Sequence, residues 1–434
     1  MSFLTKTLIH PGFWTLTLLV VANMIGAGVF TTSGFSMDAL GSPERVVWAW
    51  LFAGTIAMAG AFSYGQLVKE MPESGGEYLF LSRAAHPMLG FIAGWVSLIA
   101  GFSGAIAFAA TTLEEYAVPA RPDWLPSGLI AVLSIVLAGA FHGLRPQAGA
   151  MLQNVIVLLK LFLLGGILVF AATAMADLPQ NEVTGVSPEP TGFGLLGAFA
   201  SSLVWISLSY SGFNAAVYLA GEVSDPKRVV PRSMLAATLI VTILYVLLNA
   251  VFVYANPAEV ISGQADVAAI TARSLGGPFF ESLVRWTIVA CLLTSVFSMM
   301  MAAPRVYAKM ADDGLLPKDL RFEHDQATGP RAATLLQVGL ASLLVLVTSL
   351  QGLLSYLGMT LSLCAACSVG CLFLPSIRKN RGWHPTDLIA VFYLISTVVS
   401  AILLTVFEPR QLLGTVVTFS AGAVVYVLVA KRPA

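Results

Sequence analysis

Residues 23–34 read NMIGAGVFTTSG and lie in the middle of the first long apolar stretch of the chain. Closely spaced glycines and a cluster of hydroxyl residues interrupt a segment in which a membrane helix would favour leucine or alanine. Backbone groups that leave a helix at membrane depth are tolerated only where protein buries them or where they line a water-filled cavity. The stretch therefore predicts a broken helix beside a cavity within the membrane.

The composition is that of a membrane protein. Of the 434 residues, 57% are hydrophobic and only 11% are charged, whereas a soluble domain carries about 25% charged residues. The 23 basic and 23 acidic residues give a net charge of zero, which offers no basis for nucleic-acid binding. Apolar runs long enough to span a bilayer recur along the whole chain. They predict twelve transmembrane helices, at residues 13–36, 45–70, 87–118, 126–143, 149–176, 193–221, 231–255, 277–311, 330–350, 352–374, 385–407 and 409–431. The polar stretch 257–273 is expected to lie across one mouth of the bundle.

The basic residues predict the orientation, because cytoplasmic loops are enriched in lysine and arginine. With a cytoplasmic N-terminus, 17 of the 23 basic residues fall on the cytoplasmic side, five fall on the opposite side, and Lys160 stays inside a span. The apolar run from Phe13 has no cleavage site after a short core, so it is interpreted as a retained first helix. We therefore expect a multi-pass protein of the plasma (inner) membrane with both termini in the cytoplasm.

A second interruption, SLSYSGFN at residues 207–214, occurs in the sixth predicted span, five spans after the first. Interruptions at corresponding positions of two halves indicate a transporter binding site at the interface of inverted repeats. Glycines that merely let helices pack closely are the alternative interpretation of either stretch alone. The pairing favours the transporter.

Other classes of membrane protein have less support. An enzyme would need a buried nucleophile, base or metal cluster, and a channel would be expected to show a continuous polar lining. The four cysteines lie inside apolar runs and are interpreted as free thiols that pack as small side chains. We therefore expect no enzyme activity, no metal site and no cofactor.

Five stretches together resemble the amino acid–polyamine–organocation (APC) superfamily of transporters, in particular bacterial relatives of the L-type and cationic amino acid transporters. These stretches are MIGAGVF (24–30), MPESGGEYLF (71–80), YSGFN (210–214), AGEVSDPKRVVPR (220–232) and APRVYAKMADDGLLPK (303–318). The resemblance implies an all-α LeuT-type fold with a 5+5 inverted repeat plus two C-terminal helices, in which helices 1 and 6 are discontinuous. It implies a first repeat at 1–176, a second at 177–374, and helices 11 and 12 with a cytoplasmic tail at 375–434.

The resemblance also implies a substrate site at the two breaks. The matched residues are Gly26, Ala27 and Gly28, whose amides hold the substrate carboxylate, and Met24, Leu208, Ser209 and Ser211, whose carbonyls surround its ammonium group. A helix N-terminus attracts an anion and freed carbonyls attract a cation, so the two breaks suit a zwitterionic amino acid. The gate candidates are Trp205, Tyr210 and Glu222.

Lys160 lies near the middle of the fifth predicted span, in NVIVLLKLFLLGG (154–166). A charged side chain at that depth costs about 2.5 kcal/mol or more. The residue looks like the fifth-helix lysine of L-type relatives, whose ammonium takes the place of a sodium ion between helices 1, 5 and 8. Its expected partners are Ser295, Ser298 and the carbonyls of Gly26 and Ala27.

The expected function is sodium-independent transport of neutral L-amino acids by alternating access, with exchange as the favoured mode. The centres of the cavity-lining spans carry no acidic residue that would pair with a cationic substrate, and Ala215 and Ala216 leave room for a side chain. A proton-coupled symporter with Lys160 as proton carrier, an amine or cationic amino acid carrier, and a transporter-like nutrient sensor stay as alternatives. The expected partners are an amino acid, the lipid bilayer and, for a symporter, protons, while the oligomeric state stays open.

Overall fold

A computed structural model of the protein describes residues 11–144, 149–176, 190–312, 314–320 and 331–430. The described residues contain helices and connecting turns and no β-strand, which confirms the all-α prediction. In chain order the helices are α1 (Phe13–Met24), α2 (Gly28–Leu40), α3 (Pro43–Glu70), α4 (Gly76–Ala84), α5 (Pro87–Val96), η1 (Ser97–Gly104), α6 (Ala105–Ala117), α7 (Leu129–Leu144), α8 (Gly149–Ala176), α9 (Gly192–Tyr210), η3 (Ala215–Glu222), α10 (Pro226–Tyr254), α11 (Ala258–Ile261), α12 (Val267–Asp312), η4 (Lys318–Leu320), α13 (Arg331–Val347), α14 (Leu350–Gly370), η5 (Cys371–Phe373), α15 (Pro375–Arg381), α16 (Asp387–Phe407) and α17 (Pro409–Ala430). Segment η1 is a π-helix, and η3, η4 and η5 are 3-10 helices.

The helices identify a polytopic membrane protein. Within the described ranges, nine helical segments are long and apolar enough to cross a bilayer, and the bent pair α1–α2 makes a tenth. Two shorter apolar helices, α7 and α13, lie where the sequence predicts its fourth and ninth spans.

The label α12 covers two helical segments, because Gly277 between them is not helical (φ 72°, ψ −170°). This break lies at the residue where the sequence predicts the start of the eighth span. Polar residues 267–273 belong to the separate helical segment before it. The short helix α11 and the turn after it do lie against α2, since the Gly263 amide donates to the Gly34 carbonyl at 2.9 Å.

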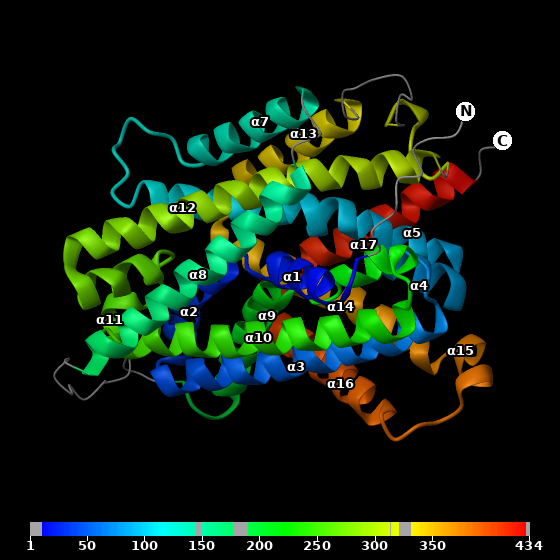
Figure 1. The fold of residues 1–434 in the computed structure, drawn as a ribbon, viewed down its shortest axis with the longest axis horizontal. Helices are drawn as coiled ribbons and strands as arrows, with labels where there is room; N and C mark the ends of the chain where they lie inside the picture. Colours follow the sequence, from blue (N-terminus) through cyan, green and yellow to red (C-terminus); the bar gives the residue numbers. More distant parts are fainter. Residues whose placement is uncertain (1–10, 145–148, 177–189, 313, 321–330, 431–434) are drawn as a thin grey trace.

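The broken helices lie in the middle of the bundle. Figure 1 shows α1, α2 and α9 between one layer that contains α3 and α10 and another that contains α7, α12 and α13. Helix α11 lies at one end of the molecule, and α4 and α15 lie at the other. This placement surrounds both breaks with protein, as irregular backbone in a membrane requires.

Both predicted interruptions are present, and they contact each other. Helix α1 ends at Met24 and α2 begins at Gly28 with a bend of 44°, while α9 ends at Tyr210 and a turn at 211–214 leads into η3. A Cβ on Gly28 would lie 2.2 Å from the Ser209 Oγ. A Cβ on Gly212 would lie 2.9 Å from the Asn23 carbonyl oxygen. Glycine is therefore needed on each side for the two breaks to pack together.

The substitution Gly212→Ala tests this packing. Gly212 has φ +97°, which is strained for any L side chain, and its surroundings have no room for a methyl group. We expect a loss of about 1 kcal/mol or more of stability, measured as a lower midpoint of thermal unfolding of the purified protein. The control is Gly339→Ala in α13, where an added Cβ meets no atom within 4 Å. Equal midpoints for the two variants would contradict the packing argument.

Candidate functional site

A cavity of about 130 Å³ lies between the two breaks. Its walls come from the α1–α2 break and from α6, α8, α9 and α12. A single water needs about 10–15 Å³ by the same measure, so the cavity has room for a solute of several heavy atoms. The predicted site residues that line it are Met24, Gly26, Ala27, Gly28, Lys160, Leu208, Ser209, Ser211 and Ser295. The structure thus brings the predicted substrate residues together around one space.

The backbone of the breaks offers hydrogen-bonding groups to this cavity. The Met24 carbonyl accepts a hydrogen bond from the Tyr245 hydroxyl at 2.7 Å, and the Leu208 carbonyl accepts one from the Ser211 amide at 3.1 Å. Each carbonyl oxygen has two lone pairs, so both keep capacity for a ligand. The first amides of α2 have no carbonyl partner within their own helix, and they form the N-terminus that suits an anion.

Tyr245 is a site residue that the sequence analysis missed. It is fully buried in α10, and its hydroxyl holds the carbonyl at the end of α1. Its ring also packs against Trp50 and Tyr210, with ring centroids 5.5 Å and 5.2 Å away. The only signal in the sequence is a tyrosine within the otherwise aliphatic run ILYVLL (243–248).

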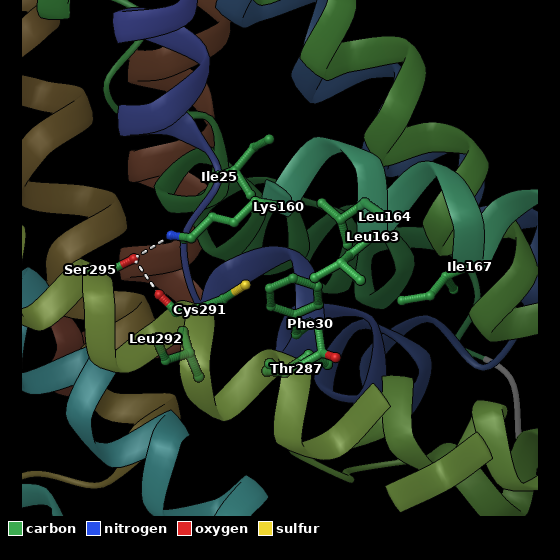
Figure 2. A pocket seen from close by; sticks show the side chains of 12 residues that line it. Ile25, Phe30, Lys160, Leu163, Leu164, Ile167, Thr287, Cys291, Leu292 and Ser295 are labelled. Atoms are coloured by element: carbon green, nitrogen blue, oxygen red, sulfur yellow. Dashed lines mark hydrogen bonds between the residues drawn. The ribbon is translucent and has the colours of Figure 1, made fainter. Parts of the chain in front are cut away.

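Lys160 reaches from α8 to α12, as Figure 2 shows around a smaller adjoining cavity. Its side chain is 7% exposed. The Nζ donates to the Ser295 Oγ at 2.8 Å, and that hydroxyl donates to the Cys291 carbonyl at 3.0 Å. Lys160, Ser295 and Gly26 line both cavities. The ammonium group therefore lies beside the first break.

The expected partners of Lys160 are only partly present. Ser295 accepts a hydrogen bond from Lys160. Among the described residues, no hydrogen bond joins Lys160 to the carbonyl of Gly26 or Ala27. The Ala27 carbonyl instead accepts from the Phe30 amide at 3.1 Å and from the Thr31 hydroxyl at 3.3 Å, which uses both of its lone pairs. The Ala27 carbonyl is thus occupied, and the Gly26 carbonyl as a partner of Lys160 stays a prediction. The side chain of Ser298 lies outside the described part of the chain.

The three gate candidates do not line the 130 Å³ cavity. The Trp205 indole donates to the Ser355 Oγ at 2.7 Å, and the Tyr210 hydroxyl donates to the Trp50 carbonyl at 3.3 Å. Tyr210 lines a separate cavity of about 50 Å³ between α3, α9, α14 and α16. Glu222 is exposed at the end of η3. A gating role for these residues stays a prediction.

The comparison with protein families agrees with the fold and the cavity. A family model described as amino acid permease matches residues 12–429. The chain belongs to this family, within the APC superfamily. Members of the family and the permease's relatives are transporters rather than enzymes. The predicted resemblance is confirmed.

The permease is also similar to individual amino acid transporters. It is 26% identical over 341 residues to the serine/threonine exchanger SteT of Bacillus subtilis, covering 76% of this chain and 75% of that protein. It is 25% identical over 355 residues to the large neutral amino acids transporter small subunit 2 of Homo sapiens, covering 78% of this chain and 64% of that protein. It is 21% identical over 391 residues to the Asc-type amino acid transporter 1 of Mus musculus, covering 87% of this chain and 73% of that protein.

The substitution Ser295→Ala tests the buried lysine contact. It leaves the Lys160 ammonium without its hydrogen-bond acceptor, which costs about 1–3 kcal/mol for a buried polar group. We expect a lower midpoint of thermal unfolding in the purified permease. The matched control is Ser202→Ala, because the Ser202 Oγ is buried and has no partner within the described residues. Midpoints that stayed equal in the two variants would show that the contact contributes nothing.

Proposed function

We propose that the permease is a sodium-independent secondary transporter that exchanges neutral L-amino acids by alternating access. The observation that carries the proposal is that two helix breaks and a buried lysine border one cavity, and that the described residues lining it include no acidic side chain. The breaks supply backbone donors and acceptors, the lysine supplies a fixed cation, and the cavity supplies the volume.

The binding mode follows from the polarity of the backbone. The α-carboxylate of the substrate would bind the amides at Gly26, Ala27 and Gly28, where α2 begins. The α-ammonium would bind the carbonyls of Met24, Leu208, Ser209 and Ser211. Both groups can be held at once because the two breaks touch each other at Gly28 and Ser209.

The cavity lining favours a neutral side chain. The space beyond the breaks is bordered by Ala105, Phe108 and Ala109 from α6 and by Thr294 and Met299 from α12. A lysine or arginine side chain would be desolvated here without an anionic partner, and an unpaired buried charge is costly. This supports neutral substrates over amines and cationic amino acids.

Lys160 supports sodium independence. A sodium ion and an ammonium group both require surrounding oxygen ligands, and a tethered ammonium beside Ser295 repels a second cation from the same space. A proton-coupled symporter with Lys160 as the proton carrier is the second candidate, because among the described residues of the cavity wall this lysine is the ionisable one. A nutrient sensor would share the binding site but would not move its ligand.

The relatives support exchange as the mode of transport. The name of the Bacillus subtilis relative describes an exchanger of serine and threonine. The name of the human relative describes a transporter of large neutral amino acids. A neutral amino acid is common to both, although sequence identities of 25–26% leave the individual substrate to experiment.

We extend the proposal to the architecture: twelve spans in a LeuT-type fold, with repeats at 1–176 and 177–374 and two further helices at 375–434. Counting the short helices α7 and α13 as spans gives twelve, and these two occupy the fourth place in each five-helix half. The two broken spans occupy the first place in each half. Matching irregularities at matching positions support an inverted repeat. The excess of basic residues at the α4 end supports cytoplasmic termini.

Counterflow in proteoliposomes tests the proposed transport. Purified permease is reconstituted with unlabelled serine, threonine, alanine or leucine inside, and uptake of the labelled amino acid is measured. We expect uptake that depends on internal substrate and does not change when potassium replaces sodium. Labelled lysine and arginine should not accumulate.

The same assay separates the alternatives. Uptake that rises steeply with sodium would contradict the role given to Lys160. Uptake driven by a proton gradient in the absence of internal substrate would show that the mode of transport is proton symport and not exchange. Ligand binding in a thermal-shift screen without any counterflow would indicate a sensor.

The substitution Ala105→Leu tests the assignment of the side-chain space. The added carbons would fill part of the cavity next to α6. With a bulky ligand bound, this overpacking would cost about 1–3 kcal/mol of binding free energy. We expect the KM for leucine to rise by about tenfold, because 1.4 kcal/mol is a factor of ten, and the KM for alanine to rise much less. Ala105→Ser, which keeps the volume, is the control. Equal effects on leucine and alanine would contradict the assignment.

A further inference from the structure

The first turn of α4 carries a carboxylate that is buried against the second broken helix. Glu77 in α4 is 6% exposed and follows Gly75 and Gly76, which have φ +146° and +56°. A Cβ on Gly76 would lie 2.4 Å from the ring of Tyr218 in η3. The two glycines therefore let α4 begin in direct contact with η3, and this places Glu77 at that contact.

Three donors from outside α4 converge on the Glu77 carboxylate. The Tyr64 hydroxyl in α3 donates to its Oε1 at 3.0 Å, the Asn214 side-chain amide also donates to Oε1, and the Tyr218 hydroxyl donates to Oε2 at 2.5 Å. Within the described ranges, no lysine or arginine forms an ion pair with this carboxylate. Both oxygens are thus used as acceptors of neutral donors, an arrangement that an ionised carboxylate suits and an amide does not.

These donors connect Glu77 to the binding cavity. Asn214 ends the turn 211–214, in which Ser211 lines the cavity and Gly212 packs on the backbone of Asn23. Tyr218 lies in η3, immediately after that turn. A second bond fixes the far end of η3, because the Gly221 amide donates to the Ser74 Oγ at 2.9 Å. Glu77 and Ser74 thus accept hydrogen bonds from both the turn and the helix that follow the second break.

We propose that Glu77 is a positioning residue for substrate binding: it holds the turn 211–214 in the place where its backbone can bind the substrate ammonium. This inference rests on the proposed function for the identity of the ligand. The carboxylate itself lies outside the cavity lining and acts through Asn214 and Tyr218. The first turn of α4, which carries Glu77, is then part of the binding machinery.

The test compares Glu77→Gln with Glu73→Gln in the full-length permease. Glu73 lies in the loop just before α4, but it is half-exposed and paired with Arg83, whose hydrogen bond lowers the pKa of the Glu73 carboxyl. In Glu77→Gln an NH₂ group replaces one acceptor oxygen and faces a donor. We expect the KM for counterflow to rise by about tenfold, the factor that corresponds to one lost hydrogen bond to a charged group, with a smaller change in the maximal rate.

Hydrogen–deuterium exchange gives a readout that does not depend on transport. We expect faster exchange in residues 211–222 of Glu77→Gln and unchanged exchange in α12, whereas Glu73→Gln should match the wild type in both. Tyr218→Phe, which removes one donor and keeps the ring, should shift the KM and the exchange rate in the same direction. The double variant should add little to Glu77→Gln, because both changes remove the same contact.

Two outcomes would overturn the proposal. One is that Glu77→Gln matches Glu73→Gln in both KM and deuterium exchange. The other, decisive if Glu77→Gln does not fold, is that Tyr218→Phe matches the wild type in both. If the wild type showed no counterflow of any amino acid, the proposed function would fail, while the exchange data on 211–222 would still decide whether Glu77 holds the turn.

Discussion

The contact between the two helix breaks is the constraint on which the rest of the site depends. An unpaired backbone group in a bilayer costs several kcal/mol, so neither break could persist against lipid. Each break is instead covered by the other, through Gly28 on Ser209 and Gly212 on Asn23. The same contact that shields the backbone leaves its spare donors and acceptors facing one cavity. The contact between the breaks therefore both stabilises the unwound backbone and creates the hydrogen-bonding groups available to a ligand.

Side chains from distant helices keep the breaks in this arrangement. Tyr245 holds the last carbonyl of α1 from one side, and Tyr210 at the end of α9 packs against Tyr245 and Trp50, with ring centroids 5.2 Å and 6.0 Å away. Aromatic pairs of this kind add stability beyond the area that they bury. The ends of both broken helices are thus joined through one aromatic cluster, behind the cavity rather than inside it.

Much of this site could be predicted from the chain itself, and the reason is local. Glycine and hydroxyl residues within apolar runs mark the two breaks, and a lysine within a span marks a buried polar contact. The individual residues at 24–28 and 208–211 follow from the resemblance to the APC superfamily. The partners of these groups could not be found in this way. Tyr245 is 221 positions from Met24, and nothing in its neighbourhood distinguishes it from a tyrosine that packs in the core. The Ala27 carbonyl was assigned to Lys160, but a hydroxyl four residues further along the same helix is its partner.

The same reasoning explains why the α4 loop was recognised as a motif and not as part of the site. Its glycines signal a tight turn, but the purpose of that turn is visible only when η3 is placed against it. Once the contact is known, the residue types follow from chemistry. A helix that leaves α-geometry at a binding site gains from support outside its own backbone, since its regular i→i−4 hydrogen bonds are replaced by fewer turn and 3-10 bonds. A buried carboxylate that accepts from three neutral donors provides that support without a second charge at the site. Lys160 lines the cavity beside the first break, but its hydrogen bond goes to Ser295 of α12 and not to the break itself. The two breaks are thus held differently: the first through the Tyr245 hydroxyl on the Met24 carbonyl, and the second through the Glu77 carboxylate on Asn214.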